Sequence, residues 1–150
     1  MFERLIHDVL PLVEHELRRH AVHVALFLDD LPTIYADGIQ IQQVLLNLVK
    51  NAIEAMSQVD GEHHLEIHAR NADGAVRVNV VDTGPGLATE MCGRLFHPFQ
   101  TTKAEGLGLG LPICRSLIEA HGGEIDAVAN AGQGMTFYFI IPCAPTDQDA

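Results

Sequence analysis

The segment from Asp37 to about Met56 is the longest regular pattern in the sequence, and it limits the fold more than any other feature. Its apolar residues recur every three or four positions, which is the spacing of one helix face. Asp37 is followed three residues later by Gln40, a pair typical of a capping box that opens a helix. We therefore expect a single helix whose apolar face is formed by Ile41, Val44, Leu45, Leu48, Ala52 and Met56.

Shorter patterns lie on both sides of this helix. The spacing predicts helices over Phe2 to about His20, Thr89 to Leu95 and about Leu109 to His121, the last ended by Gly122-Gly123. It predicts strands over Val22–Leu28, Ile34–Ala36, His64–Arg70, Ala75–Val81, Glu124–Ala129 and Met135–Ile141, with turns at Asn71–Gly74 and Asn130–Gly134. This order predicts an α+β fold, a two-layer α/β sandwich whose mixed, mostly antiparallel sheet has helices on one face.

Composition narrows the classes of function. The 150 residues suit one domain, for which we expect residues 1–143, followed by a frayed tail over 144–150. A formal net charge of −11 argues against nucleic acid as a partner, and the only lysines are Lys50 and Lys103. No apolar run is long enough to cross a membrane, and the separated cysteines suit a reducing compartment, so we expect a cytoplasmic location whether or not a longer parent is anchored.

Three polar residues on the long helix form the first candidate site. Asn47, Asn51 and Glu54 fall within an arc of roughly 60°, opposite the apolar stripe. A solvated helix face is the alternative for these residues. Asparagine is a mediocre helix former, however, so the presence of two on one face favours a functional role over simple solvation. An amide oxygen is a hard ligand of the kind that Mg²⁺ prefers.

A carboxylate at the end of a strand forms the second candidate site. Asp82 follows the apolar run Val78–Val81 and precedes Gly84 and Gly86. An ordinary Asp-Gly turn is the alternative, but an unpaired carboxylate beside a buried strand is costly. A carboxylate here is able to accept the exocyclic amine of adenine and would reject guanine, which presents a carbonyl instead.

The third candidate site is the glycine-rich stretch between residues 83 and 110. Its glycines allow backbone amides to approach phosphates, and the helix that starts near Gly110 points its N-terminus at them. Lys103 is placed to meet a terminal phosphate, while Phe96 and Phe99 are expected to anchor the loop. Neither a GxGxxG run after a strand nor a GK[ST] motif occurs, which argues against dinucleotide and Walker-type sites.

In this order the motifs resemble those of sensor histidine kinases. Asn47–Ala52 resembles the N box, Asp82–Gly86 the first glycine box, Phe96–Phe99 the F box and Gly106–Gly110 the second glycine box. The likeness covers nearly the whole chain and is greatest to the nitrogen-regulation and oxygen-sensing branch. It implies the Bergerat-type ATP-binding fold of the superfamily that also contains gyrase, the heat-shock chaperone and mismatch-repair ATPases.

The resemblance also implies roles for individual residues. Asn51 would bind Mg²⁺, Asp82 would hold adenine, and residues 87–108 would form a lid over ATP. Asn47 and Lys103 would act in catalysis; related ATPases carry a glutamate where Asn47 stands, and an amide is no general base near neutral pH. The implied nucleotide site consists of Asn47, Asn51, Glu54, Asp82, Gly84, Gly86, Thr101, Thr102, Lys103, Gly106, Leu107, Gly108, Leu109, Gly110 and Thr136.

Two positions depart from the family pattern. Gln100 replaces the aromatic residue that is usual in this branch's F box, and Met135 stands where a small residue is frequent. The first departure is expected to loosen the anchoring of the lid. Neither is expected to touch the chemistry.

The function implied is binding of Mg-ATP and, in a parent two-component kinase, transfer of the γ-phosphate to a histidine on a separate dimerisation domain. A response regulator would be an indirect partner, and this domain alone is expected to be a monomer that binds ATP or ADP without phosphorylating itself.

His15, in a run that mimics the family's phosphorylation motif, is interpreted as an ordinary helix residue because a strand follows within a few residues. His64, Glu66 and His68 mimic a metal site on one strand face, but a solvated face is favoured. The alternative function is an ATPase or ATP-gated interaction module of the same fold.

Overall fold

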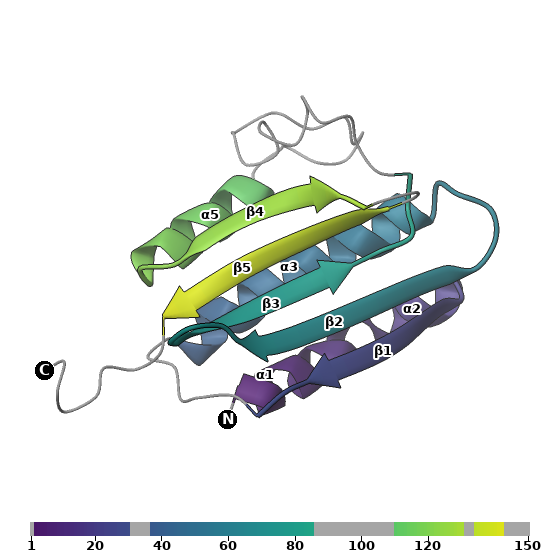
Figure 1. The fold of residues 1–150 in the computed structure, drawn as a ribbon. Helices are drawn as coiled ribbons and strands as arrows, with labels where there is room; N and C mark the ends of the chain where they lie inside the picture. The colour runs from purple at the N-terminus through teal and green to yellow at the C-terminus, as the bar shows by residue number, and fades with distance from the viewer. Residues whose placement is uncertain (1, 31–36, 86–109, 131–133, 143–150) are drawn as a thin grey trace, which may run out of the picture.

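The protein folds as one five-stranded sheet with helices against a single face (Figure 1). The computed structural model describes residues 2–30, 37–85, 110–130 and 134–142. Its helical elements are α1 (Phe2–Val9), the 3-10 helix η1 (Leu10–Val13), α2 (Glu14–Arg19), α3 (Gly38–Met56) and α5 (Gly110–Ala120). Its strands are β1 (Val22–Leu28), β2 (His63–Asn71), β3 (Ala75–Val81), β4 (Glu124–Ala129) and β5 (Met135–Pro142).

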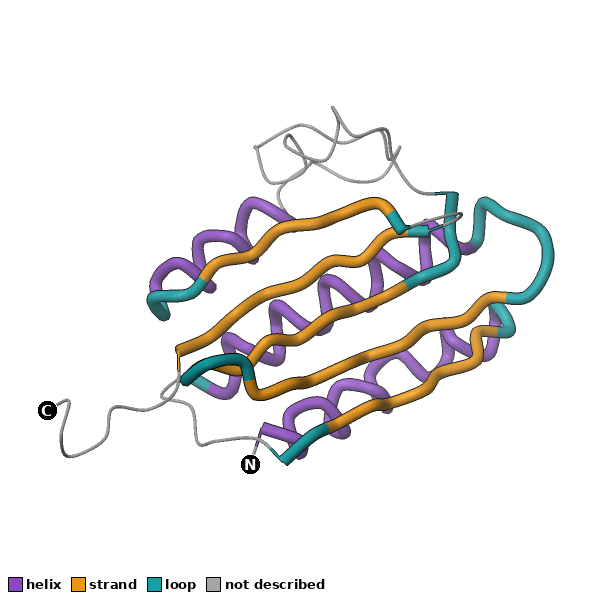
Figure 2. Tube along the Cα trace, viewed as in Figure 1, coloured by secondary structure: helices purple, strands orange, loops and turns teal. Residues whose placement is uncertain are grey.

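The order of strands in the sheet is β1-β2-β3-β5-β4, so β5 inserts between β3 and β4 (Figure 2). β1 pairs with β2 in parallel, and the other three pairs are antiparallel. The mixed, mostly antiparallel sheet and the α+β class expected from the sequence are both confirmed. Because β3 and β5 are direct neighbours, the end of β3 at Val81 meets the start of β5 at Thr136.

The core lies between the sheet and the helical layer, in which α3 contributes the most buried residues. All six residues predicted for the apolar face of this helix are buried, and Val49 and Ile53 are buried with them, so the buried face is wider than the predicted stripe. The strands contribute every second residue, as expected when one face of a sheet packs on helices. These buried strand residues are Leu65, Ile67, Ala69, Val76, Val78, Val80, Ala127, Met135, Phe137, Phe139 and Ile141.

The first predicted helix is wrong in one respect: it is interrupted. A 3-10 turn separates α1 from α2, and Pro11 occupies its first turn. Proline has no backbone N–H and its ring clashes with the preceding turn, so it opens a helical segment rather than continuing one. The predicted strand at residues 34–36 and the predicted helix at 89–95 lie outside the described residues.

Asp37 links the N-terminus of α3 to His121, which follows the C-terminus of α5. Its side chain accepts the N–H groups of Ile39 at 2.9 Å and Gln40 at 3.2 Å, which confirms it as the N-cap of α3. The reciprocal bond expected from Gln40 is replaced, because the Asp37 N–H donates to Nε2 of His121 at 3.1 Å. The other ring nitrogen of His121 donates to the Leu117 carbonyl at 2.7 Å, so this imidazole is protonated at Nδ1.

Glycines close the last helix and the central hairpin as predicted. At the end of α5, Gly122 N–H bonds to the Glu119 carbonyl and Gly123 N–H to the Ile118 carbonyl, the two bonds of a Schellman motif. In the β2–β3 hairpin, Asp73 and Gly74 both have positive φ, 50° and 82°. This is the type I′ geometry that matches the twist of the adjoining strands.

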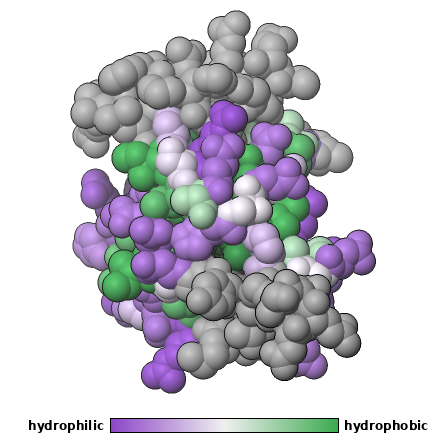
Figure 3. All heavy atoms as spheres, turned by 90° about the vertical axis from the view of Figure 1, so that its left-hand side faces the viewer, coloured by the Kyte–Doolittle hydropathy of each residue, from purple (hydrophilic) through white to green (hydrophobic). Residues whose placement is uncertain are grey.

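The end of the molecule at which the β2–β3 hairpin lies faces the viewer in Figure 3. Hydrophilic and hydrophobic residues are interspersed there, without a continuous apolar area among the coloured residues. Within the described part of the chain, no helix has the length and apolar character needed to cross a membrane.

Candidate functional site

Asp82 lies at the end of β3 and is the one buried charged side chain among the described residues, with 1% of its surface exposed. Its Oδ1 accepts two backbone N–H groups, from Gly84 at 2.8 Å and from Met135 at 3.2 Å. The backbone N–H of Asp82 in turn donates to the Met135 carbonyl at 3.0 Å. Two segments that are distant in sequence therefore fix the position of one carboxylate.

Burial sets the protonation behaviour of this carboxylate. Removal from water raises the pKa of Asp82 above its ordinary value of 3.8, although the bonds from Gly84 and Met135 oppose that rise by stabilising the charged form. No basic side chain among the described residues forms an ion pair with Asp82. A carboxylate held at this cost without a cation is a candidate for ligand recognition.

Thr136 lies close to Asp82, at the start of β5. The two are linked through Asn130, which accepts a hydrogen bond from the Thr136 hydroxyl and donates from Nδ2 to the Asp82 carbonyl at 3.2 Å. Asn130 was not predicted as a site residue, because in the sequence it is only the first residue of a turn. Met135 departs from the family pattern in its side chain, but the atoms that meet Asp82 belong to its backbone.

The loop after Asp82 packs directly on the C-terminal part of α3. A Cβ placed on Gly84 would lie 3.1 Å from both the backbone and the side chain of Ala55, so a larger residue would push the loop away from the helix. The neighbouring Thr83 hydroxyl donates to the sulfur of Met56 at 3.5 Å. These contacts bring Asp82 to the end of α3 that carries Asn51 and Glu54.

Of the three polar residues predicted on α3, Asn47 and Asn51 are half-buried and Glu54 is exposed. Asn47 is partly covered because α5 packs beside α3 on the side where Asn47 lies. Its Nδ2 donates to Sγ of Cys114, on α5, at 3.5 Å. Cys114 was not singled out as a site residue from the sequence.

Other predicted site residues lie outside the described part of the chain: Gly86, Thr101, Thr102, Lys103, Gly106, Leu107, Gly108 and Leu109. Phe96, His97, Phe99 and Gln100 also lie outside it. Gly110 is described as the first residue of α5. Because Cys114 in the next turn contacts Asn47, the N-terminal part of α5 lies beside the amide-bearing part of α3.

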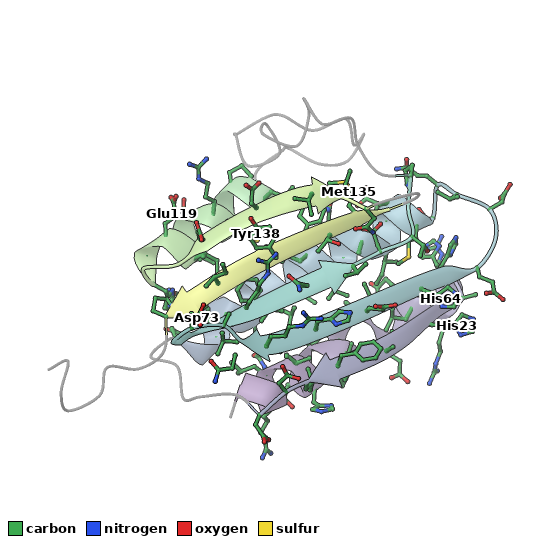
Figure 4. The ribbon with its side chains drawn as sticks, in the orientation of Figure 1. His23, His64, Asp73, Glu119, Met135 and Tyr138 are labelled. Carbon is green, nitrogen blue, oxygen red and sulfur yellow. The ribbon has the colours of Figure 1, made fainter. Side chains whose placement is uncertain are left out.

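The histidines of β1 and β2 form pairs on the open face of the sheet. His64 bonds to Glu62 at 3.1 Å and His68 to Glu66 at 2.8 Å, while His23 stacks on His64 with ring centroids 5.3 Å apart (Figure 4). In the described ranges, no three His, Cys, Asp or Glu side chains gather in a way that would hold a metal ion.

The fold and the residues at the end of β3 define a class of protein. A sheet covered on one face, with a buried aspartate beside an amide-bearing helix, is the architecture of histidine kinase catalytic domains. The solved catalytic domain of the histidine kinase ThkA superposes with a TM-score of 0.82 at 40% identity, over 93% of this chain and 91% of that one. The structure of full-length ShkA in complex with AMPPNP superposes with a TM-score of 0.85 at 34% identity, over 97% of this chain and 31% of that one.

Sequence comparison gives the family. Residues 36–145 match the model described as "Histidine kinase-, DNA gyrase B-, and HSP90-like ATPase", and the chain belongs to this family as a protein-histidine kinase catalytic domain. It is 47% identical to the sensor protein FixL of Bradyrhizobium diazoefficiens over 111 residues, 74% of this chain and 22% of that protein. It is 37% identical to the sensor histidine kinase ZraS of Escherichia coli K12 over 147 residues, 97% of this chain and 31% of that protein. The chain thus spans less than a third of the length of these relatives.

Proposed function

We propose that this chain binds Mg-ATP between the end of β3 and α3, and that in a parent sensor kinase it transfers the γ-phosphate to a histidine on another domain. The observation that carries the proposal is the Asp82 carboxylate, which is buried, held by two backbone donors and without an ion-pair partner among the described residues. Burial of this kind is unfavourable unless a ligand completes the hydrogen bonding.

Asp82 supplies the specificity for adenine in this proposal. Both backbone donors reach Oδ1, and among the described residues no hydrogen bond is made to Oδ2. Oδ2 then accepts the exocyclic amine of adenine. Guanine presents a carbonyl oxygen at that position, and two acceptors facing each other in a buried site repel. Gly84, Gly86 and Thr136 shape the pocket around the base.

The phosphates lie toward α3 and the start of α5. Asn51 holds Mg²⁺ through its amide oxygen, a hard donor that suits this ion. The ion neutralises phosphate charge, and Lys103 with Thr101, Thr102 and the glycines 106–110 completes the site as a lid. Glu54 extends the polar rim of α3. Catalysis is then mainly positioning and neutralisation of charge, as in other phosphoryl transfers.

The parent protein supplies what the chain lacks in this proposal. Residues 1–143 act as one catalytic domain, and the phosphoacceptor histidine belongs to a dimerising helical domain. His15 is exposed on α2, a helix that β1 follows directly after His20 and Ala21, and is proposed to take no phosphate. One solved structure is that of ThkA in complex with the response regulator protein TrrA; we propose a response regulator as the indirect partner here too, in the cytoplasm.

Calorimetry of the isolated chain tests the nucleotide site. We expect weak binding of ATP and ADP with magnesium, and much weaker binding of GTP. Asn51→Ala should abolish the magnesium-dependent part of the affinity, while Asp82→Asn should weaken adenine selectivity. No heat of binding with any adenine nucleotide, under conditions where the chain is folded, would refute the site.

The rival function is ATP hydrolysis by the isolated domain. Asn47 argues against it, because an amide cannot take a proton from water near neutral pH. We expect no steady release of phosphate from ATP and no radiolabel on the chain. Sustained hydrolysis would support an ATPase instead, and stable phosphohistidine at His15 would overturn the requirement for a separate acceptor domain.

A further inference from the structure

The contact between Asn47 and Cys114 joins the two helices that border the proposed phosphate site. Cys114 is fully buried, on the second turn of α5. Its Sγ lies 3.5 Å from Nδ2 of Asn47 and 3.9 Å from the carbonyl oxygen of Val44. Both partners belong to α3 and are three residues apart, so they lie on the same side of that helix.

The direction of each hydrogen bond follows from the groups involved. A carbonyl oxygen only accepts, so the thiol hydrogen of Cys114 points at Val44. The sulfur is then left to accept, and the Asn47 amide is the donor that reaches it. An amide group carries its NH₂ and its oxygen on opposite branches. Holding Nδ2 against α5 therefore turns Oδ1 of Asn47 the other way.

We propose that Cys114 is a positioning residue that sets the rotamer of the Asn47 carboxamide, so that its oxygen faces the magnesium and phosphate end of the nucleotide. This inference rests on the proposed function, since it assumes that Asn47 lines the nucleotide site. Cys114 itself touches no ligand. It acts only through the amide, which without this partner would rotate between its two orientations.

The chemistry of the thiol suits the task. Burial raises the pKa of Cys114 to about 11, and the bond from Asn47 opposes that rise. The group therefore keeps its hydrogen at any pH near neutrality. A thiolate would lose the donor that orients it toward Val44, and the orientation would no longer be defined.

A role in packing alone predicts a different pattern of effects. If Cys114 only fills space, then Cys114→Val should be tolerated and Cys114→Ser, which buries a hydroxyl, should be the more damaging change. If it positions Asn47, serine retains both a donor and an acceptor, whereas valine keeps the volume and removes both. The two roles thus predict opposite orders for nucleotide binding.

The experiment measures Mg-ATP affinity by calorimetry for the intact chain and its variants. We expect Cys114→Val to lose about fivefold, the effect of one ordinary hydrogen bond, and Cys114→Ser to stay within about twofold. Thermal stability should follow the reverse order, with serine the less stable variant. Ile118→Val, a change at another buried position on α5, is the control for disturbed packing and should bind as the parent chain does.

A double-mutant cycle with Asn47→Ala decides whether the effect passes through Asn47. We expect Cys114→Val to cause no further loss once Asn47 is alanine, because the group it positions is gone. Additive losses, or a valine variant that binds like the parent chain, would overturn this inference and leave the proposed function standing. Failure of the parent chain to bind Mg-ATP would overturn the proposed function as well, so the two failures are distinguishable.

Discussion

Gly134 approaches Asp82 so closely that a Cβ on Gly134 would lie 2.0 Å from the Asp82 carbonyl oxygen. The contact occurs where β5 begins beside the end of β3, and the φ of Gly134 is +97°. This glycine lets the chain at Met135 come near enough to bond with Asp82 from both its N–H and its carbonyl. The shape of the proposed adenine site therefore depends on Gly134 having no side chain.

Gly134→Ala should destabilise the protein by more than about 4 kcal/mol, because it adds a steric clash with backbone to an unfavourable φ. Gly61→Ala is the matched control, since Gly61 has a φ of +104° but nothing within 4 Å of its built Cβ. The strain of φ alone should cost the control about 1–2 kcal/mol. Urea unfolding of both variants measures the difference, and equal losses would show that the close approach has no consequence.

Asp82→Asn should lower the affinity for adenine nucleotides and raise the stability of the fold. We expect adenine nucleotide affinity to fall by about tenfold to a hundredfold, the effect of losing a hydrogen bond to a charged group. The amide oxygen of asparagine is still able to accept the bonds from Gly84 and Met135, and the cost of burying a charge disappears. The variant should therefore be more stable than the parent chain at neutral pH, as measured by thermal unfolding.

The pH dependence of that difference has a definite sign. The pKa of Asp82 is raised above 3.8 by burial, so the stability linked to its proton is fully present below 3.8 and is lost as the pH rises through the raised value. The advantage of Asp82→Asn should therefore be largest at neutral pH and shrink on acidification. A constant advantage at every pH would contradict the assignment.

His63 should keep its positive charge to a higher pH than an ordinary histidine. Its Nδ1 lies 2.8 Å from the His20 carbonyl and its Nε2 lies 2.8 Å from the Val59 carbonyl, and carbonyl oxygens only accept. Both ring nitrogens must then be protonated. These bonds, first that to Val59 and then that to His20, raise the pKa of His63 above 6.5, and Asp60 adds to the rise while burial opposes it.

This charge should make stability decline on the alkaline side. Because the pKa of His63 is raised, its contribution is fully present below pH 6.5 and is lost as the pH rises through the folded value. His63→Gln should remove that decline, while His64→Gln, at the exposed neighbouring position, should keep it. Nitrogen-detected NMR should show that both ring N–H groups of His63 persist to a higher pH than those of an ordinary histidine. Loss of one ring proton at or below the ordinary value would contradict the arrangement.

Asp37 should stabilise α3 mainly through its side-chain oxygen. Asp37→Ala removes the acceptor for two backbone N–H groups and should cost about 1 kcal/mol. Asp37→Asn keeps an acceptor at the same position and should cost only a few tenths of that. Chemical denaturation of the two variants gives the comparison, and equal losses would mean that charge rather than capping is what matters at this position.

Local patterns in the sequence were sufficient for most of the secondary structure. The helix from Gly38 to Met56 has a clear apolar period and a capping aspartate, and Gly122 ends α5 because only glycine takes its φ of 76° without strain. Each of these features depends on residues within one or two turns of one another. The interruption at Pro11 was also predictable from the chain, since proline cannot continue a helix, and the periodicity alone concealed it.

The order of the motifs and the position of Asp82 after an apolar strand were enough to indicate this carboxylate from the sequence. What no local pattern contains is the pairing of β3 with β5, which brings the Met135 N–H to a carboxylate 53 residues earlier. The same holds for Asn47, whose half-buried position depends on α5 and its Cys114, 67 residues away. The periodicity of a sequence indicates whether a residue is buried or exposed. Which atoms contact that residue depends on how distant segments pack together. The sequence by itself therefore determined the helices, the strands and the candidate carboxylate and amides, whereas the tertiary structure decided which donors hold them and how they face one another.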